Sequence, residues 1–85
     1  MNLYESQKTI TTKEDFIQFL ELLLNDFKEN SGDWENNTLL TFLESLHAYA
    51  NDVDGFYSNN DLTFDKNNPS WKSFAQILLG AKVYE

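Results

Sequence analysis

Residues 34–53, with the sequence WENNTLLTFLESLHAYANDV, carry the clearest helical periodicity in the chain. Apolar side chains recur there at intervals of three and four residues, which places them on one face of an α-helix. The expected core stripe consists of Leu39, Leu43, Leu46, Ala50 and Val53. Either Asp33 caps this helix, with Trp34 in its first turn, or Asn37 caps a shorter one. The stretch therefore predicts a core helix that ends near residue 53.

Residues 13–29 are predicted to form a helix with a wider apolar surface. Its buried face is expected to contain Phe16, Phe19, Leu20, Leu23 and Phe27. Leu24 broadens this face, and Ile17 and Leu22 lie beside or opposite it. Such a width suits a helix that is contacted on more than one side, within a small bundle or at a dimer interface. Gly32 is expected to end the helix in the left-handed conformation.

Capping residues mark the starts of the first and last expected helices. Either Thr11 or Thr12 caps the first, with a carboxylate three residues further along. Asn68 is expected to cap the last helix, with Pro69 in its first turn. Gly80, near the end of that helix, either weakens the last turn or permits close packing.

Length and composition limit the fold class. The 85 residues suffice for one domain, residues 1–85, and two Trp, four Tyr and seven Phe supply large rings for a small core. The absence of cysteine excludes disulfides and thiolate metal sites. We expect an all-α fold, a small compact bundle of three main helices with a long ordered loop before the last. A short N-terminal helix would make four.

The long loop is expected over residues 54–68, with a turn at Gly55. Its apolar anchors are Phe56, Tyr57, Leu62 and Phe64. The spacing of Asp52, Asp54 and Asp61 around Gly55 resembles half of an EF-hand calcium loop, but the first ligand position holds a residue that cannot ligate. Calcium binding is therefore the third of our functional hypotheses, and we expect no metal and no cofactor.

The charge of the chain indicates which partners to expect. The formal net charge is -8, arginine is absent, and every charged residue from Glu29 to Asp65 is negative. Nucleic acids and anionic membranes are not expected as partners, because both require clustered Lys or Arg. A basic protein would be attracted. No apolar run is long enough to span a membrane and no signal sequence opens the chain, so we expect a cytoplasmic protein.

The sequence offers no constellation of residues suited to catalysis. His47 is the only histidine and lies at the edge of an apolar stripe, where we expect a partly buried packing residue. A glycine-rich phosphate loop, a nucleophile elbow and a histidine pair for a metal are all absent. We expect no catalytic residues and a protein that is not an enzyme.

Several short motifs resemble a family of small bacterial helical domains of unknown function. They are Trp34-Glu35-Asn36, Pro69-Ser70-Trp71 and the closing Tyr84-Glu85. The resemblance covers residues 16–85 and implies no established activity. The chain is also similar in character to the colicin-type immunity proteins, which are small acidic four-helix inhibitors of basic nucleases. Where those proteins carry an Asp followed by a Tyr-Tyr pair and proline, this chain has DGFYS at residues 54–58.

These observations favour a non-enzymatic protein-interaction domain. Its most concrete form is an immunity-like or inhibitor protein that binds a basic protein partner through an acidic and aromatic face. The residues expected to contact the partner are Trp34, Glu35, Asp52, Asp54, Phe56, Tyr57 and Asp61. The alternative is a structural homodimer or accessory domain, in which Ile17, Leu22 and Leu24 form the interface.

Overall fold

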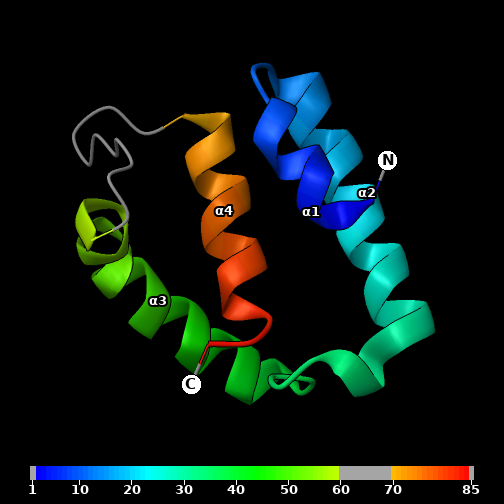
Figure 1. The fold of residues 1–85 in the computed structure, drawn as a ribbon. Helices are drawn as coiled ribbons and strands as arrows, with labels where there is room; N and C mark the ends of the chain where they lie inside the picture. The colour runs from blue at the N-terminus through cyan, green and yellow to red at the C-terminus, as the bar shows by residue number, and fades with distance from the viewer. Residues whose placement is uncertain (1, 60–69, 85) are drawn as a thin grey trace.

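The computed structural model describes residues 2–59 and 70–84, and of residues 54–59 only the helical backbone. Helices α1 (Leu3–Ser6), α2 (Lys13–Asn30), α3 (Leu39–Asn59) and α4 (Trp71–Ala81) are accompanied by the 3-10 turns η1 (Gln7–Thr9) and η2 (Ser31–Asp33) (Figure 1). No strand occurs in these residues. The predicted all-α bundle of three main helices, with a short fourth at the N-terminus, is confirmed.

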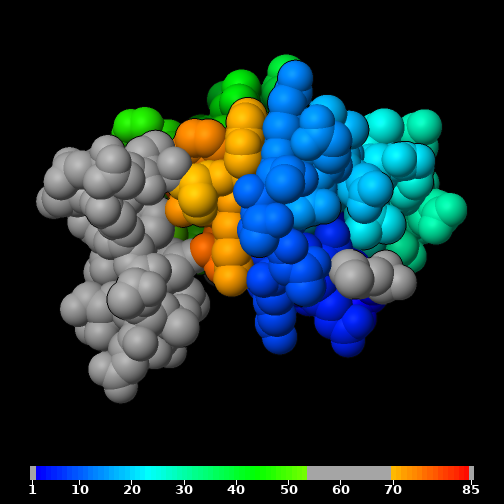
Figure 2. Space-filling model, turned by 90° about the horizontal axis from the view of Figure 1, so that it is seen from above, coloured from blue at the N-terminus to red at the C-terminus, as the bar shows by residue number. Residues whose placement is uncertain are grey.

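Helix α4 lies between α2 and α3 (Figure 1). It packs most extensively on α3 and also contacts α2 and η1, whereas α2 and α3 scarcely touch each other. Figure 2 shows the N-terminal half of α4, in orange, directly beside the blue residues of η1 and early α2. The two longest helices are therefore held apart by the third. None of the described helices is long and apolar enough to cross a membrane.

The core gathers around α2. Its buried apolar members are Leu3, Ile10, Phe19, Leu23, Trp34 and Ala75. Phe19 is completely enclosed, and Phe16 packs its ring 5.4 Å from that of Trp71 at the start of α4. Leu22 is half-buried against the same cluster, so this side of α2 is already covered within the chain.

The start of α2 follows one of the two predicted alternatives. Thr12 is the N-cap, and its hydroxyl accepts the Asp15 N–H at 3.1 Å. Oδ2 of Asp15 accepts the backbone N–H groups of Thr11 and Thr12, which completes the capping box. The backbone hydrogen bond from Thr11 leads the contacts that lower the pKa of Asp15.

The predicted caps of the other two main helices are wrong. Helix α3 begins after Thr38, whose Oγ1 accepts the Thr41 N–H at 3.1 Å, rather than at Asp33 or Asn37. Helix α4 is capped by Ser70 and not by Asn68. In both cases a hydroxyl next to the first turn provides the acceptor, because it can reach the free N–H three residues along. Asn68 and Pro69 themselves lie outside the described residues.

Of the two helix breaks predicted at glycines, the one near Gly32 occurs without a left-handed residue, and the one at Gly55 does not occur. Gly32 lies in the 3-10 turn η2 and not in a left-handed position. Helix α3 continues through Asp54 and Gly55 to Asn59, so the predicted turn and the first part of the predicted loop are helical. The half EF-hand loop is therefore wrong for Asp52 and Asp54, because a continuous helix cannot wrap its side chains around one cation. The rest of the loop, including Asp61, falls outside the described residues.

Candidate protein-interaction groove

Helix α3 buries a different face from the one predicted. Val53 is buried, but Leu39 and Leu43 in the predicted core stripe are 74% and 50% exposed. The polar Ser45 is buried in their place, and its hydroxyl donates to the Tyr84 carbonyl at 2.7 Å. His47 is exposed rather than partly buried. Leu46 is half-buried and Ala50 is exposed, so Val53 alone of the predicted stripe is buried. Hydrogen bonding turns the Ser45 side of the helix inward instead.

The unpaired carbonyl groups at the end of α4 explain why α3 buries this face. The last carbonyls of a helix have no partner within it. Asn36, just before α3, donates its side-chain amide to the carbonyls of Ala81 at 3.0 Å and Tyr84 at 2.8 Å. Its backbone N–H also donates to the Lys82 carbonyl at 3.2 Å. Asn36 and Ser45 together fix the start of α3 against the end of α4.

Gly80 allows α3 and α4 to approach closely. The Tyr49 ring occupies the space that a Cβ at residue 80 would fill. Tyr49 in turn stacks on Tyr84, with ring centroids 5.1 Å apart, and the Tyr84 hydroxyl donates to Asp52. Of the two roles predicted for Gly80, the structure shows close packing.

A buried ion pair ties α4 to α2. Lys82 is 5% exposed, and its Nζ lies 3.0 Å from Asp26 Oδ2. The same oxygen accepts the indole N–H of Trp34 at 2.7 Å, and the Lys82 ammonium lies 5.6 Å from the Trp34 ring centroid. Burial pushes the pKa of Asp26 upward, but the hydrogen bonds from Lys82 and Trp34 outweigh it and lower that pKa. This pair locks Trp34 in place.

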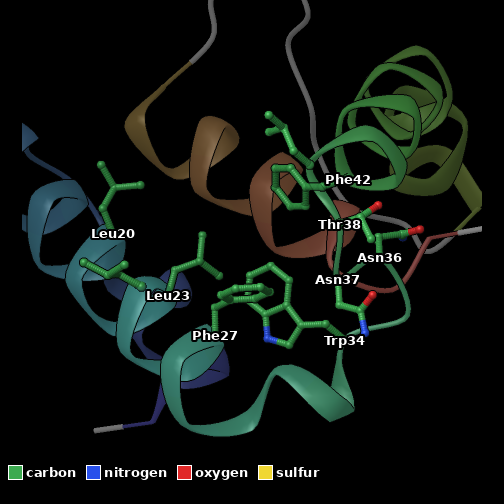
Figure 3. A pocket seen from close by; sticks show the side chains of 10 residues that line it. Leu20, Leu23, Phe27, Trp34, Asn36, Asn37, Thr38 and Phe42 are labelled. Atoms are coloured by element: carbon green, nitrogen blue, oxygen red, sulfur yellow. The ribbon is translucent and has the colours of Figure 1, made fainter.

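A groove of about 390 Å³ opens between α2 and α3, with Trp34 at its base (Figure 3). It is lined by Leu20, Leu23, Leu24, Phe27, Trp34, Asn36, Asn37, Thr38, Leu39 and Phe42. The rings of Phe27 and Phe42 pack on Trp34 from opposite walls, with centroids at 5.1 and 5.9 Å. The lining is almost entirely apolar, and α4 lies behind it (Figure 3).

Large apolar side chains continue out of the groove onto both walls. On α2 they are the exposed Ile17, Leu20, Leu24 and Phe27. On α3 they are the exposed Leu39, Leu40 and Leu43. Leu24 is 54% exposed and Leu40 is 68% exposed. Exposed large apolar side chains on both sides of an apolar groove are the kind of surface that marks an interaction site.

The two walls differ in charge. Helix α3 and the connection before it contain no Lys or Arg, and Asp33, Glu35 and Glu44 are exposed there. Helix α2 carries both signs beside its apolar residues, including the exposed Glu21 and Lys28. The connection that flanks Trp34 is therefore acidic, whereas the α2 side carries both signs of charge.

Comparison with known proteins places the chain in a family. A model described as a family of unknown function (DUF7660) matches residues 12–85. The chain belongs to this family. The matched region begins at Thr12, the N-cap of α2, and so takes in α2, α3 and α4 and leaves out α1 and η1. Neither the curated proteins nor the solved structures contain a match to the chain. The predicted membership of a family of unknown function is confirmed.

The structure describes the side chains of three predicted contact residues, Trp34, Glu35 and Asp52, and these three do not form one cluster. Trp34 is 7% exposed and forms the base of the groove, rather than an exposed ring. Glu35 is exposed in the connection before α3, and Asp52 is exposed on α3 beside Tyr84. Asp54, Phe56 and Tyr57 lie in the last turns of α3, where only the backbone is described, and Asp61 lies outside the described residues.

Sequence reasoning missed the main feature of the site, the α3 wall. Leu39 and Leu43 were assigned to the core because their spacing is that of a buried stripe. The sequence feature that correctly indicated a wall of the groove was the wide apolar surface of α2, on which Ile17 and Leu24 lie outside the core face. Among the described residues, no group of His, Cys, Asp and Glu is placed to hold a metal ion.

Proposed function

We propose that this chain is a non-enzymatic protein-interaction domain that binds a basic protein partner in the groove between α2 and α3. The observation that carries the proposal is the exposed apolar surface on both walls of the groove. On each helix these apolar residues recur with the spacing that is typical of a buried core face. Full burial of a Leu side chain stabilises by about 1.5–3 kcal/mol. Leu39, Leu40 and Leu24 are more than half exposed, so a partner that covers them gains several such contributions.

Charge supports a basic partner. The net charge of -8 and the acidic residues of the connection before α3 would draw a cationic protein toward the groove and raise its association rate. The most concrete form of the proposal is an immunity-like or inhibitor protein of the bacterial cytoplasm, which covers a basic toxin or enzyme. In that role Glu35 is a rim contact, and Trp34 supports the groove from its base.

Site-specific photo-crosslinking in the host cell tests this proposal. A photoreactive phenylalanine analogue replaces Leu24 or Leu39 in the groove, and Gln18, exposed on the far side of α2, serves as the control position. We expect both groove positions, and not Gln18, to give the same adduct with one basic protein. That protein, once purified, is expected to bind the chain one to one and to lose affinity when Leu39 is changed to Glu. Equal adducts from all three positions, or none, would overturn the proposal.

A homodimer remains the second candidate, because Ile17 and Leu24 of its expected interface are exposed. Leu22, the third expected residue, is half-buried against the core. Two copies would bring together net charges of -8 each, which opposes association at low salt. Sedimentation equilibrium separates the two candidates. A doubled mass that Leu24→Glu abolishes would support the homodimer, and a single mass that does not depend on concentration would exclude it.

A further inference from the structure

We propose that the partner inserts one amphipathic α-helix into the groove, with its apolar face toward Trp34 and Lys or Arg residues toward the connection before α3. This inference rests on the proposed function and specifies the element that is bound. It is argued from the arrangement of the helices, from the chemistry of the groove lining and from the charge of the connection before α3.

The helical arrangement leaves the place of one long helix empty. Helices α2 and α3 flank α4 and scarcely touch each other, and the groove runs between them. In a four-helix bundle a fourth long helix packs between two such neighbours and covers their apolar faces. Helix α1 is too short for this role, and it packs on α2 and η1. An added helix would therefore complete the bundle.

The size of the apolar surface suits a short helix. On α2 the exposed residues run from Ile17 to Phe27, which at 1.5 Å per residue is about 15 Å, or close to three turns. On α3 they run from Leu39 to Leu43, and the half-buried Leu46 continues the same face. A partner helix with apolar residues at positions i, i+3, i+4 and i+7 matches this length.

The groove does not suit the other common forms of bound peptide. Addition of a β-strand requires a free sheet edge, and the residues that the structure describes contain no strand. Proline-rich segments dock on exposed aromatic rings. Here Trp34 is buried, and its indole N–H already donates to Asp26. The walls offer mainly aliphatic surface, from Leu20, Leu24 and Leu39, and the apolar face of a helix fits it.

Charge selects a basic helix and excludes a second copy as the preferred occupant. Asp33 and Glu35 are exposed and flank Trp34, the base of the groove, in the connection before α3. Basic residues beside the apolar face of a bound helix would meet these carboxylates. The exposed helical surface of a second copy carries the same acidic residues, so it would meet them with like charge.

Methyl NMR titration with model peptides tests the inference. The probe is a synthetic helix-forming peptide of Leu and Lys, about 14 residues long, with Leu on one face. The first comparison peptide keeps the Leu positions and carries Glu for Lys, and the second has the same composition in strict alternation, the pattern of a strand. We expect the Leu/Lys helix to shift the methyl signals of Leu24, Leu39 and Leu43. We expect both comparison peptides to bind about tenfold more weakly or worse.

Charge-matched variants separate apolar docking from simple attraction. Leu39→Glu adds a negative charge, which would strengthen non-specific binding of a basic peptide, yet we expect about tenfold weaker binding because an apolar contact is lost. Gln18→Glu adds the same charge on the far side of α2 and should not weaken binding. Glu35→Lys should weaken binding about fivefold at low salt, and Glu29→Lys, on the outer side of α2, less so. All four positions are exposed, so thermal melting should confirm intact folds.

Two results would overturn the inference. One is equal affinity of the Leu/Lys helix for the native chain and the Leu39→Glu variant. The other is equal binding of the alternating peptide. Failure of the proposed function can be told apart from failure of this inference by the crosslinking experiment. If the proposed function is wrong, the groove positions give no specific adduct in the cell. If they do give one basic partner while the helical peptide fails to bind, the groove binds a protein but its occupant is not a helix.

Discussion

Loss of the ion pair between Asp26 and Lys82 should destabilise the fold strongly. Lys82 is 5% exposed, and Asp26 Oδ2 lies 3.0 Å from its ammonium and also accepts the Trp34 indole N–H. Asp26→Asn leaves the ammonium buried without a counterion, and breaking such a pair costs about 3–5 kcal/mol. The Asp26 side chain is 21% exposed, so we expect the lower end, about 3 kcal/mol. For a small domain this corresponds to a fall in Tm of about 15 °C.

The pH dependence of stability provides a second readout of the pair. The pKa of Asp26 is lower in the folded chain than its ordinary value of 3.8, so its contribution is present above that value and is lost as the pH falls through the folded pKa. Burial alone would lower the pKa of Lys82, but the hydrogen bond to Asp26 raises it above 10.5. The contribution of Lys82 is therefore complete below pH 10.5 and is lost as the pH rises through the folded pKa. Asp26→Asn should flatten the acid limb.

Urea unfolding followed by tryptophan fluorescence measures these effects. Asp26→Asn, Lys82→Met and the double variant form a thermodynamic cycle, and Asp33→Asn is the control at an exposed carboxylate. We expect the double variant to lose less unfolding free energy than the two single variants lose together, because neither charge is then left without its partner. A loss below about 1 kcal/mol for Asp26→Asn, or strict additivity, would refute the reasoning, since the buried ammonium would then not depend on its partner.

Three further substitutions test the contacts that position α3 against α4. Gly80→Ala should destabilise by about 1–3 kcal/mol although Ala favours helices, because its Cβ meets the Tyr49 ring; a higher urea midpoint would contradict this. Asn36→Ala should cost about 1–3 kcal/mol in the same assay, because it removes two hydrogen bonds to helix-end carbonyls. The hydrogen bond to Asp52 raises the pKa of Tyr84, so the free energy of unfolding should fall as the pH rises above about 10. Tyr84→Phe should show a smaller fall. Equal dependence of stability on pH in the two chains would exclude the hydrogen bond.

Local signals in the sequence were sufficient to predict the helices. The period of three to four residues predicted α2 almost to the residue, and it predicted the existence of α3 and α4. Helix α3 runs six residues beyond the predicted end at Val53, through Gly55. A single glycine lowers helix propensity by only about 1 kcal/mol, so it did not stop the helix there.

The orientation of α3 depends on contacts distant in sequence and was not predictable from periodicity. Ser45 is buried because the Tyr84 carbonyl, 39 residues away, accepts its hydroxyl. That contact and the Asn36 hydrogen bonds turn Leu39 and Leu43 outward, against their own pattern. The pairing of Lys82 with Asp26 is likewise distant in sequence, and a lysine at a helix end by itself indicates only a favourable interaction with the helix dipole.

The sequence pointed to only part of the candidate groove. An acidic surface with aromatic residues was expected, and Trp34 and Glu35 do lie at or beside the groove. The Trp34 ring, which was expected to contact the partner, is buried because its indole N–H donates to Asp26. No local sequence pattern indicated this hydrogen bond. The excess apolar width of α2, noted from Ile17 and Leu24, was the one sequence feature that identified a wall of the groove.

The accessibility of the groove walls to solvent is the most direct test of this account. Leucine methyl NMR with a soluble paramagnetic probe measures it on the dilute monomer and again with the Leu/Lys helix bound. We expect strong broadening of the Leu24, Leu39 and Leu43 methyl signals in the free chain, protection of Leu23 in both states, and protection of all four on binding. If Leu39 and Leu43 are as protected as Leu23 in the free monomer, the groove is covered within the chain and the account is wrong.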